Sequence, residues 1–281
     1  MIYIILRAQL GNQLFQLFNG ISLALKYNLK YKICVNKNNN TIFGNNITYF
    51  DNFLLELKDK IEIYDEKIIE NNIYHYNENT FHYSDIIFEI ENDIYLNGFF
   101  QSYKYFKDYY NDIYNLLNID SKKNLVKSKY IKYFNKKTIA IHFRIGDYYY
   151  LQHFHAILGI DYYFKSLNKM QDLLKTDISD YNILYFCQEC DNNIVNKYIM
   201  YLKSINNSYN FIKISDDIIN YEQMMIISNC DNIIIANSTF SWFGAYFSNS
   251  KNIIYPQKWF GPGNKSKILS DLFPSNWIQI I

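Results

Sequence analysis

The sequence TIAIHFRIGDYYY, residues 138–150, begins as an apolar run and ends in polar and charged side chains. The apolar residues 139–141, with Phe143 after them, predict a strand over residues 139–143 that is covered on both faces, as in parallel sheets. His142, Arg144 and Asp147 follow at its carboxyl end, where burying charge without a partner is costly. His142 and Arg144 alternate along the chain, so we expect both on one side of the strand. We interpret these three residues as part of a ligand site.

Strands and helices alternate after this run, which indicates right-handed βαβ units and a parallel sheet. The predicted strands are residues 182–187, 211–214, 232–236 and 252–255, and the predicted helices are residues 161–175, 191–203, 220–229 and 240–248. In the N-terminal half, strands are predicted at 2–6, 31–35, 61–64 and 94–98, and helices at 12–27, 102–117 and 121–134. We therefore predict an α/β fold of two Rossmann-like domains, residues 1–136 and 137–281, with a cleft between them. Ligands of such sheets bind beyond the carboxyl ends of the strands.

Length and charge narrow the class of protein. The chain has 281 residues, of which 49% are apolar and 19% aromatic, which allows a sizeable core and is unlike a disordered chain. Its 28 basic and 27 acidic residues nearly cancel, and the absence of a basic stripe argues against a nucleic-acid partner. Arg7 interrupts the apolar N-terminus after six residues. Because neither a signal peptide nor a membrane span is recognisable, we expect a cytoplasmic protein.

No set of metal ligands stands out in the sequence. Cys187 and Cys190 form one C-x-x-C, but a structural zinc site needs a second ligand pair, so we expect both to be packing residues. Asp216 and Asp217 are adjacent, and we interpret them as the cap of a helix. We therefore expect no metal and no cofactor.

A second candidate segment is RAQLGNQLFQ, residues 7–16. A predicted strand stops, Gly11 permits an unusual turn, and a helix starts whose free N–H groups can bind an anion. Asn12 and Gln13 add neutral donors at the same point. A helix merely capped by Asn12 explains the pattern equally well. The segment is neither a dinucleotide fingerprint nor a Walker loop, because the required glycines and lysine are missing.

The third candidate segment is IIIANSTFSWFGA, residues 233–245. A fully apolar strand ends, and Asn237, Ser238 and Thr239 lead from it directly into a helix. Several polar groups therefore lie next to the free N–H groups of the helix. Capping explains one hydroxyl residue, but not three polar residues in a row. We expect Trp242 and Phe243 to pack inside the helix layer. Together with the guanidinium of Arg144, the two helix N-termini suit a diphosphate leaving group stabilised without a metal.

The same segments give a family resemblance. The sequence HFRIGDY at 142–148 resembles the H-x-R-R-G-D-Y of the α-1,2-fucosyltransferases of glycosyltransferase family 11, and GNQLFQ at 11–16 is similar to their G-N-Q-x-F-Q. NSTFSWFGA at 237–245 resembles N-S-S-F-S-W-W-G-A, GFFQSYKYF at 98–106 resembles G-Y-F-Q-S-x-K-Y-F, and PQKWF at 256–260 also fits. These five segments follow the family's order along nearly the whole chain.

The resemblance implies a GT-B-type fold and an inverting, metal-independent transfer of L-fucose from GDP-β-L-fucose to a galactose-like acceptor. It implies that the N-terminal domain lies on the acceptor side and that the C-terminal domain binds the nucleotide sugar. The donor-site residues that it implies are Asn12, Gln13, His142, Arg144, Glu189, Asn237, Ser238, Thr239 and Ser241. Among these, Arg144 would meet the β-phosphate. Asp147 is either the base that takes the acceptor proton or the residue that orients Arg144, and both roles stay open.

Two departures from the family pattern bear on function. The second arginine of the family motif is Ile145 here, and strand alternation predicts that it points away from the side of Arg144. The family's F-S-D-D is Phe186-Cys187-Gln188-Glu189 here, so Glu189 keeps the one carboxylate that could meet guanine. A fucosyltransferase of another linkage or acceptor, such as an α-1,6- or protein O-fucosyl type, and an inactive glycan- or nucleotide-binding protein are the alternatives.

Overall fold

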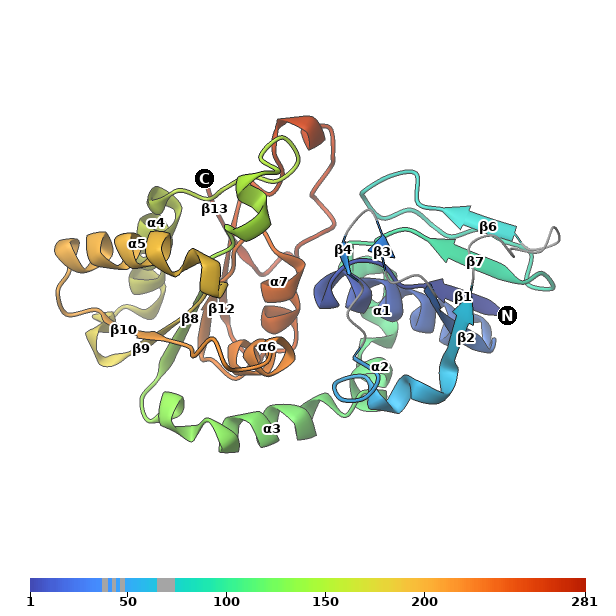
Figure 1. Cartoon of the computed structure of the whole chain (residues 1–281), viewed down its shortest axis with the longest axis horizontal. Coiled ribbons are helices and arrows are strands. Elements are labelled where there is room, and N and C mark those ends of the chain that lie inside the picture. The colour runs from blue at the N-terminus through green and yellow to red at the C-terminus, as the bar shows by residue number, and fades with distance from the viewer. Residues whose placement is uncertain (37–39, 42–43, 46–48, 65–73) are drawn as a thin grey trace. The chain divides into compact units, whose positions relative to one another are not determined.

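The computed structural model describes residues 1–36, 40–41, 44–45, 49–64 and 74–281. The chain divides into two compact units (Figure 1). Unit 1 comprises Met1–Ile119 and Lys267–Pro274, and unit 2 comprises Asp120–Ser266 and Ser275–Ile281. Each unit contains its own parallel β-sheet, which confirms the prediction of two α/β domains.

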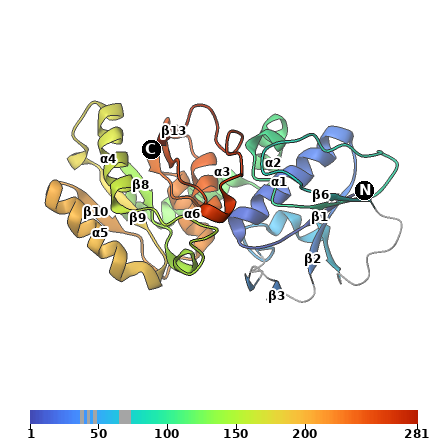
Figure 2. The ribbon, with the colours of Figure 1, turned by 90° about the horizontal axis from the view of Figure 1, so that it is seen from above.

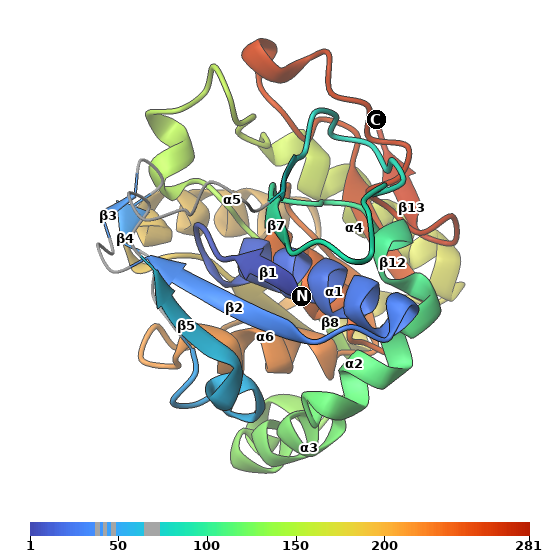
Figure 3. The same ribbon diagram turned by 90° about the vertical axis from the view of Figure 1, so that its right-hand side faces the viewer.

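The sheet of unit 1 has the strand order β5-β2-β1-β7-β6, and all its neighbours are parallel. Its strands are β1 (Ile2–Ile5), β2 (Tyr31–Asn36), β5 (Ile61–Tyr64), β6 (Tyr74–Asn77) and β7 (Ile94–Asn97). Two short strands, β3 (Asn40–Thr41) and β4 (Gly44–Asn45), form a separate antiparallel pair. Figure 3 shows β5, β2 and β1 side by side, with helix α1 against the sheet.

Helix α1 (Leu10–Tyr27) packs directly on β1. It ends at Asn28, which adopts a left-handed conformation and donates its N–H to carbonyls of the last turn, as asparagine often does at helix ends. Gly20 explains how close the helix approaches the sheet. A Cβ atom at Gly20 would lie 2.4 Å from the side chain of Ile4, so any larger residue would push α1 away from β1.

The sheet of unit 2 has the strand order β10-β9-β8-β11-β12-β13, again with all neighbours parallel. Its strands are β8 (Thr138–His142), β9 (Asn182–Phe186), β10 (Asn210–Lys213), β11 (Asn232–Ile234), β12 (Asn252–Pro256) and β13 (Ile278–Ile280). Numbered within the unit, this is the 3-2-1-4-5-6 order of dinucleotide-binding domains. Every residue of β8 is buried, as its largely apolar sequence predicted.

Helices cover both faces of this sheet. Helices α4 (Ile160–Leu174) and α5 (Asn192–Ile205) lie on one side, and α6 (Asn220–Ser228) and α7 (Thr239–Tyr246) lie on the other (Figures 1 and 2). The core under α4 and α5 includes Ile141, Leu167 and Val195, all fully buried. Trp242 and Phe243 of α7 are also fully buried, so their predicted packing role is confirmed.

The boundary between the units lies earlier than the predicted one at residue 136. Helix α3 (Ile119–Lys129) is held almost entirely by unit 2. The amine of Lys123 donates to the carbonyl oxygen of Phe247 at 2.8 Å, and Lys129 pairs with Glu222 at 2.7 Å. The C-terminal part also departs from the prediction, because residues 267–274 belong to unit 1. Contacts between residues far apart in sequence decide where the boundary lies and which unit residues 267–274 join, and no local sequence pattern indicates such contacts.

Most predicted elements are present, but some differ. The predicted helix at 102–117 is two 3₁₀ turns followed by the short helix α2 (Tyr110–Leu116). Ser102 fixes the first turn, since its hydroxyl accepts from the N–H of Lys104 and donates to the carbonyl oxygen of Asp271 at 2.8 Å. Strands β6 and β13 were not predicted. β13 has three residues, too few for a periodic signal, and its pairing with β12 defines it.

No helix in the described ranges combines the length and apolar character that crossing a membrane requires.

Candidate active site

Two of the three candidate segments leave neighbouring strands of unit 2. β8 pairs with both β9 and β11, but the chain continues from β8 to β9 and from β11 to β12, on opposite sides. The direction in which the chain adds strands to the sheet therefore reverses between β8 and β11. Ligands of open parallel sheets bind at such a switch point. His142 ends β8, and Asn237 follows shortly after β11. The sequence placed each motif at a strand end, and the strand order makes the two ends neighbours.

Direct contacts join the two motifs. The hydroxyl of Tyr148 donates to the backbone oxygen of Asn237 at 3.2 Å, and its ring stacks on His155 with 4.2 Å between ring centres. The amide nitrogen of Asn237 donates to the carbonyl oxygens of Ala156 at 2.8 Å and Trp259 at 2.9 Å. Asn237 therefore anchors two loops at the switch point, a role that the sequence did not indicate. Its predicted contact with a donor stays a prediction.

Arg144 is held in place from three sides. Its Nη1 donates to Oε1 of Gln188 at 2.6 Å, its Nη2 donates to Oδ1 of Asp147 at 2.5 Å, and its guanidinium carbon lies 4.7 Å from the centre of the Tyr148 ring. The side chain is 18% exposed, so part of the guanidinium reaches solvent. A planar guanidinium that is already oriented loses little freedom on binding an anion.

Asp147 has a geometry that supports one of its two possible roles. Its side chain is 58% exposed, and its carboxylate forms an ion pair with Arg144. This contact supports the role of orienting Arg144. A base must instead lie within hydrogen-bond reach of the hydroxyl from which it takes the proton. The role of Asp147 as a base stays a prediction.

The loop after β8 is fixed by the turn that leads into α5. Gly146 adopts a left-handed conformation with φ of 33°, which favours glycine. Its N–H donates to both carboxylate oxygens of Asp191 at 2.9 Å each. A Cβ atom at Gly146 would lie 1.8 Å from Oε1 of Gln188. Asp191 is only 4% exposed, so this buried carboxylate fixes the loop that carries Arg144. The exposed Gln188 leaves no room for a larger residue at position 146.

His142 is a buried neutral imidazole. Burial, and to a lesser degree the positive charge of Arg144, lowers the pKa of His142 to about 3. Its Nδ1 and the Oδ1 of Asn237 are both buried, with no hydrogen-bond partner among the described residues. Leaving a buried polar atom unsatisfied costs about 1–3 kcal/mol. Two such atoms at the switch point are therefore natural contacts for a polar ligand.

The start of α7 provides further hydrogen-bonding groups at the switch point. Ser238 is the N-cap residue, and its side chain makes no capping bond in the described structure. The hydroxyl of Ser241 is fully buried and donates to the carbonyl oxygen of Ser238 at 3.3 Å. Thr239 begins the helix and is half-buried. Since no side chain caps this end, its N–H groups remain available to an anion.

In unit 1, the two motifs at residues 11–16 and 98–106 also meet at a switch point. The chain leaves β1 toward β2, whereas β7 lies on the other side of β1. The motif after β1 contacts the motif after β7, because Nε2 of Gln101 donates to Oδ1 of Asn12 at 2.8 Å and Nε2 of Gln16 donates to the carbonyl oxygen of Gly98 at 3.1 Å. Asn12 is thus held by a side chain that lies 89 residues away in sequence.

The turn before α1 differs from the predicted one. The left-handed residue is Ala8, with φ of 61°, whereas Gly11 lies inside the first turn of α1. The predicted role of Gly11 in the turn is therefore wrong. Nε2 of Gln13 donates to the carbonyl oxygen of Ala8 at 2.8 Å, so Gln13 supports this turn. The predicted share of Asn12 and Gln13 in the donor site stays a prediction.

Gln188 and Asp191 contact the loop of the candidate site but were not predicted as site residues, whereas Glu189 was. Glu189 is exposed, and its predicted contact with a nucleobase stays a prediction. Gln188 and Asp191, its near neighbours, instead contact the loop of Arg144 and Gly146. The available signal was the position of Asp191 at the start of a helix, where a carboxylate is favoured.

The described residues include no group of three or more His, Cys, Asp or Glu side chains that could hold a metal ion. Asp216 pairs with Lys213 and accepts from the amide of Asn192 at 3.0 Å. Because α6 begins only at Asn220, the predicted capping role of Asp216 and the adjacent aspartate is wrong. Cys190 is exposed, so its predicted packing role is wrong as well.

The chain is similar in sequence to two curated bacterial enzymes, although no family model matches it. It is 33% identical to the O-antigen biosynthesis glycosyltransferase WbnK of Escherichia coli over 154 residues, which are 52% of this chain and 45% of WbnK. It is 28% identical to an α-1,2-colitosyltransferase of Escherichia coli over 192 residues, which are 65% of this chain and 61% of that enzyme. The chain thus spans about half the length of the curated relatives that it matches.

Solved structures of glycosyltransferases share the fold. The ADP-heptose lipopolysaccharide heptosyltransferase II of Escherichia coli matches with a TM-score of 0.53 at 11% identity, covering 100% of this chain and 90% of that one. The α-1,6-fucosyltransferase NodZ, crystallised with GDP, matches with a TM-score of 0.50 at 8% identity, covering 88% of this chain and 92% of NodZ. The two parallel-sheet α/β units are therefore those of the GT-B fold, which confirms the predicted fold.

Proposed function

We propose that this protein is a glycosyltransferase that transfers L-fucose from GDP-β-L-fucose to a hydroxyl of a terminal galactose-like sugar, forming an α-1,2 linkage. The observation that carries the proposal is that Arg144 and the uncapped start of α7 follow the neighbouring strands β8 and β11 at the switch point of unit 2, where Tyr148 beside Arg144 donates to the backbone of Asn237. The names of the two sequence relatives, a glycosyltransferase and an α-1,2-colitosyltransferase, support the reaction type. The motif resemblance to family 11 supports fucose as the sugar.

The geometry suits the charge that such a reaction develops. Breaking the bond between sugar and phosphate leaves negative charge on the diphosphate and positive charge on the sugar ring. The oriented guanidinium of Arg144 and the N–H groups of α7 stabilise the first charge without reorganising. His142 is neutral near pH 7 because burial lowers its pKa to about 3, so it offers a hydrogen bond and no charge. We assign Arg144 as the main contact of the β-phosphate.

The stereochemistry and the proton transfer complete the proposal. A single displacement inverts the anomeric carbon, so a β-linked donor gives an α-linked product. The acceptor hydroxyl must lose its proton, and Asp147 is the carboxylate that we propose for this step once the donor diphosphate competes for Arg144. We further propose that turnover needs no metal, and that the protein works in the cytoplasm on an oligosaccharide or glycoconjugate.

A second candidate differs in the sugar or the linkage. One relative is a colitosyltransferase, which favours colitose as an alternative sugar. NodZ forms α-1,6 linkages, but at 8% identity it supports the fold and not the linkage. In either case Arg144 keeps its role at the diphosphate, because the change concerns the sugar end of the donor.

A donor and acceptor screen tests the proposal. Purified protein is incubated with GDP-fucose, GDP-mannose, UDP-sugars or nucleotide-linked colitose and a panel of galactosides, with and without EDTA. We expect GDP release only with GDP-fucose and a galactoside, no effect of EDTA, and an α-1,2 product by NMR. Arg144→Ala should lower the rate at least about a hundredfold, whereas Lys203→Ala on the exposed side of α5 should not. Equal GDP release by wild type and Arg144→Ala would overturn the assignment.

A further inference from the structure

Unit 2 has a hollow at the end of the sheet opposite to Arg144. It is a pocket of about 410 Å³, within the range of roughly 300–1,000 Å³ that is usual for small-molecule sites. Its lining includes Asn232 and Asn252, the first residues of β11 and β12. Arg144 lies beyond the carboxyl end of β8. The pocket is therefore separate from the candidate active site.

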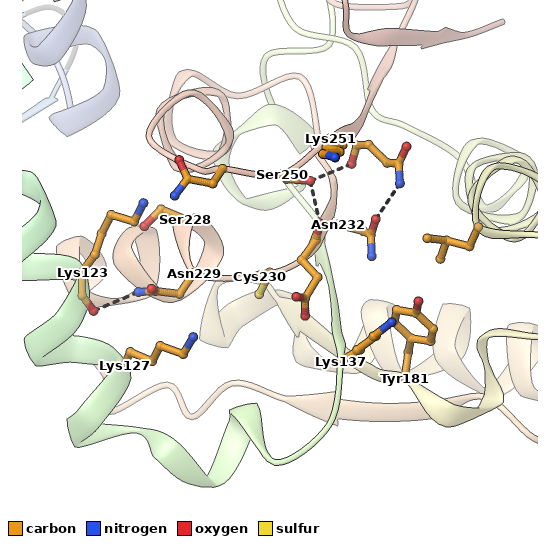
Figure 4. A pocket seen from close by; sticks show the side chains of 14 residues that line it. Lys123, Lys127, Lys137, Tyr181, Ser228, Asn229, Cys230, Asn232, Ser250 and Lys251 are labelled. Atoms are coloured by element: carbon orange, nitrogen blue, oxygen red, sulfur yellow. Dashed lines mark hydrogen bonds between the residues drawn. The ribbon is translucent and has the colours of Figure 1, made fainter. Parts of the chain in front are cut away.

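The pocket gathers positive charge. Lys123, Lys127, Lys137 and Lys251 line it, against a single carboxylate, that of Asp231. In Figure 4, Lys123 and Lys127 enter from α3 on one side, whereas Lys137 and Tyr181 lie on the opposite side. The side chains of Lys127, Lys137 and Lys251 are exposed, so an anion that enters from solvent can reach their ammonium groups and compensate their charge.

The carboxylate does not provide that compensation. Oδ2 of Asp231 accepts from the N–H of Thr138 at 2.8 Å and from its hydroxyl at 2.9 Å. No ammonium group in the described ranges forms an ion pair with Asp231. The carboxylate therefore serves to fix the start of β8.

Helix ends favour two of the four lysines, and Lys127, in the last turn of α3, is one of them. Amino ends of strands in this fold face helix C-termini, whose carbonyls attract cations. Lys123 has this role, because its amine donates to the carbonyl oxygen of Phe247 just beyond α7 at 2.8 Å. Among the described residues, the amines of Lys127, Lys137 and Lys251 make neither a hydrogen bond nor an ion pair, although Lys127 lies 5.6 Å from the ring centre of Phe134. Three ammonium groups thus remain for a ligand.

We propose that this pocket is a binding site for a phosphate-bearing anion, held by Lys127, Lys137 and Lys251. A phosphate group presents several acceptor oxygens, and hydrogen bonds between charged groups are the strongest available to such a ligand. The amide and hydroxyl groups around the lysines are largely occupied. The amide nitrogen of Asn252 donates to Asn232 at 2.9 Å, for example, and the hydroxyl of Ser250 donates to the carbonyl oxygen of Asp231 at 2.8 Å. Charge rather than shape therefore dominates recognition.

The test compares two triple variants of equal charge. One carries Lys127→Gln, Lys137→Gln and Lys251→Gln in the pocket. The control carries K169Q, K197Q and K203Q, which replace exposed lysines of α4 and α5 outside the pocket. Binding of inorganic pyrophosphate is measured by calorimetry in the Arg144→Ala background, which weakens the candidate active site. Binding of vesicles of phosphatidylglycerol with phosphatidylcholine is measured by sedimentation, against vesicles of phosphatidylcholine alone.

We expect the pocket variant to bind at least about tenfold more weakly, and the control to stay within about twofold of the parent. Loss of pyrophosphate binding identifies a free phosphate ligand, and loss confined to acidic vesicles identifies a lipid headgroup. An equal loss in both triple variants, or no loss in the pocket variant, would overturn the proposal. A thermal melt checks that each variant folds, and Lys251→Glu alone should weaken binding in the same direction.

Discussion

Lowering the pH from 7 to 5 should destabilise unit 2 through His142. Burial lowers the pKa of this imidazole from 6.5 to about 3 in the folded protein, so the folded state stays unprotonated over this range. The unfolded chain takes up a proton below pH 6.5. Protonation therefore favours unfolding, and the stability present above pH 6.5 is lost progressively as the pH falls toward 3.

The magnitude follows from the two pKa values. pH 5 lies about 1.5 units below the unfolded pKa of 6.5, and each unit corresponds to about 1.36 kcal/mol. The free energy of unfolding should therefore fall by about 2 kcal/mol between pH 7 and pH 5 because of this one residue. The folded pKa lies well below pH 5, so the expected loss is set by the unfolded state.

Urea unfolding followed by tryptophan fluorescence measures this loss. Trp242, Trp259 and Trp277 all lie in unit 2, as His142 does, so the signal reports the unit in question. The comparison is the change in unfolding free energy between pH 7 and pH 5 in wild type and in His142→Leu. Their difference cancels the titration of all other groups.

The control is His153→Leu, which replaces an exposed histidine of the same unit and should keep the pH dependence of the wild type. The reasoning is refuted if His142→Leu loses as much stability as the wild type between pH 7 and pH 5. That outcome would mean that the imidazole becomes protonated in the folded protein.

Three further outcomes test the loop that carries Arg144. Gly146→Ala introduces a Cβ at a left-handed position and displaces Gln188, so GDP should bind about tenfold more weakly by calorimetry; unchanged binding would contradict this. Asp191→Ala removes the buried carboxylate that accepts from the half-buried N–H of Gly146 and should cost about 1–3 kcal/mol in urea unfolding, whereas Asp191→Asn keeps an acceptor and should cost less. Gln188→Glu places a carboxylate beside Arg144 that competes with the diphosphate, so the KM for the donor should rise. Gln188→Met adds no charge and should raise the KM less. An equal rise in both variants would show that charge is not the cause.

The local sequence was enough to predict much of the fold. Apolar runs such as residues 139–141 are covered on both faces in a parallel sheet, and that environment selects apolar side chains at successive positions. Strands β8 to β12 of unit 2 follow from this pattern, and helices such as α4 follow from the helical spacing of buried residues. The three candidate segments stand at strand ends because parallel sheets expose their carboxyl ends to ligands.

Only the tertiary structure decided how these segments combine. The order β8-β11 makes the motif of Arg144 a neighbour of the motif of Asn237, and pairing between strands far apart in sequence leaves no local trace. The same holds for the bond of Asp191 to Gly146, for residues 267–274 within unit 1, and for the gathering of Lys127 with Lys251. The residue types in a segment and their spacing reflect the burial and backbone conformation of that segment. Which distant residues it contacts is set by the packing of the whole chain.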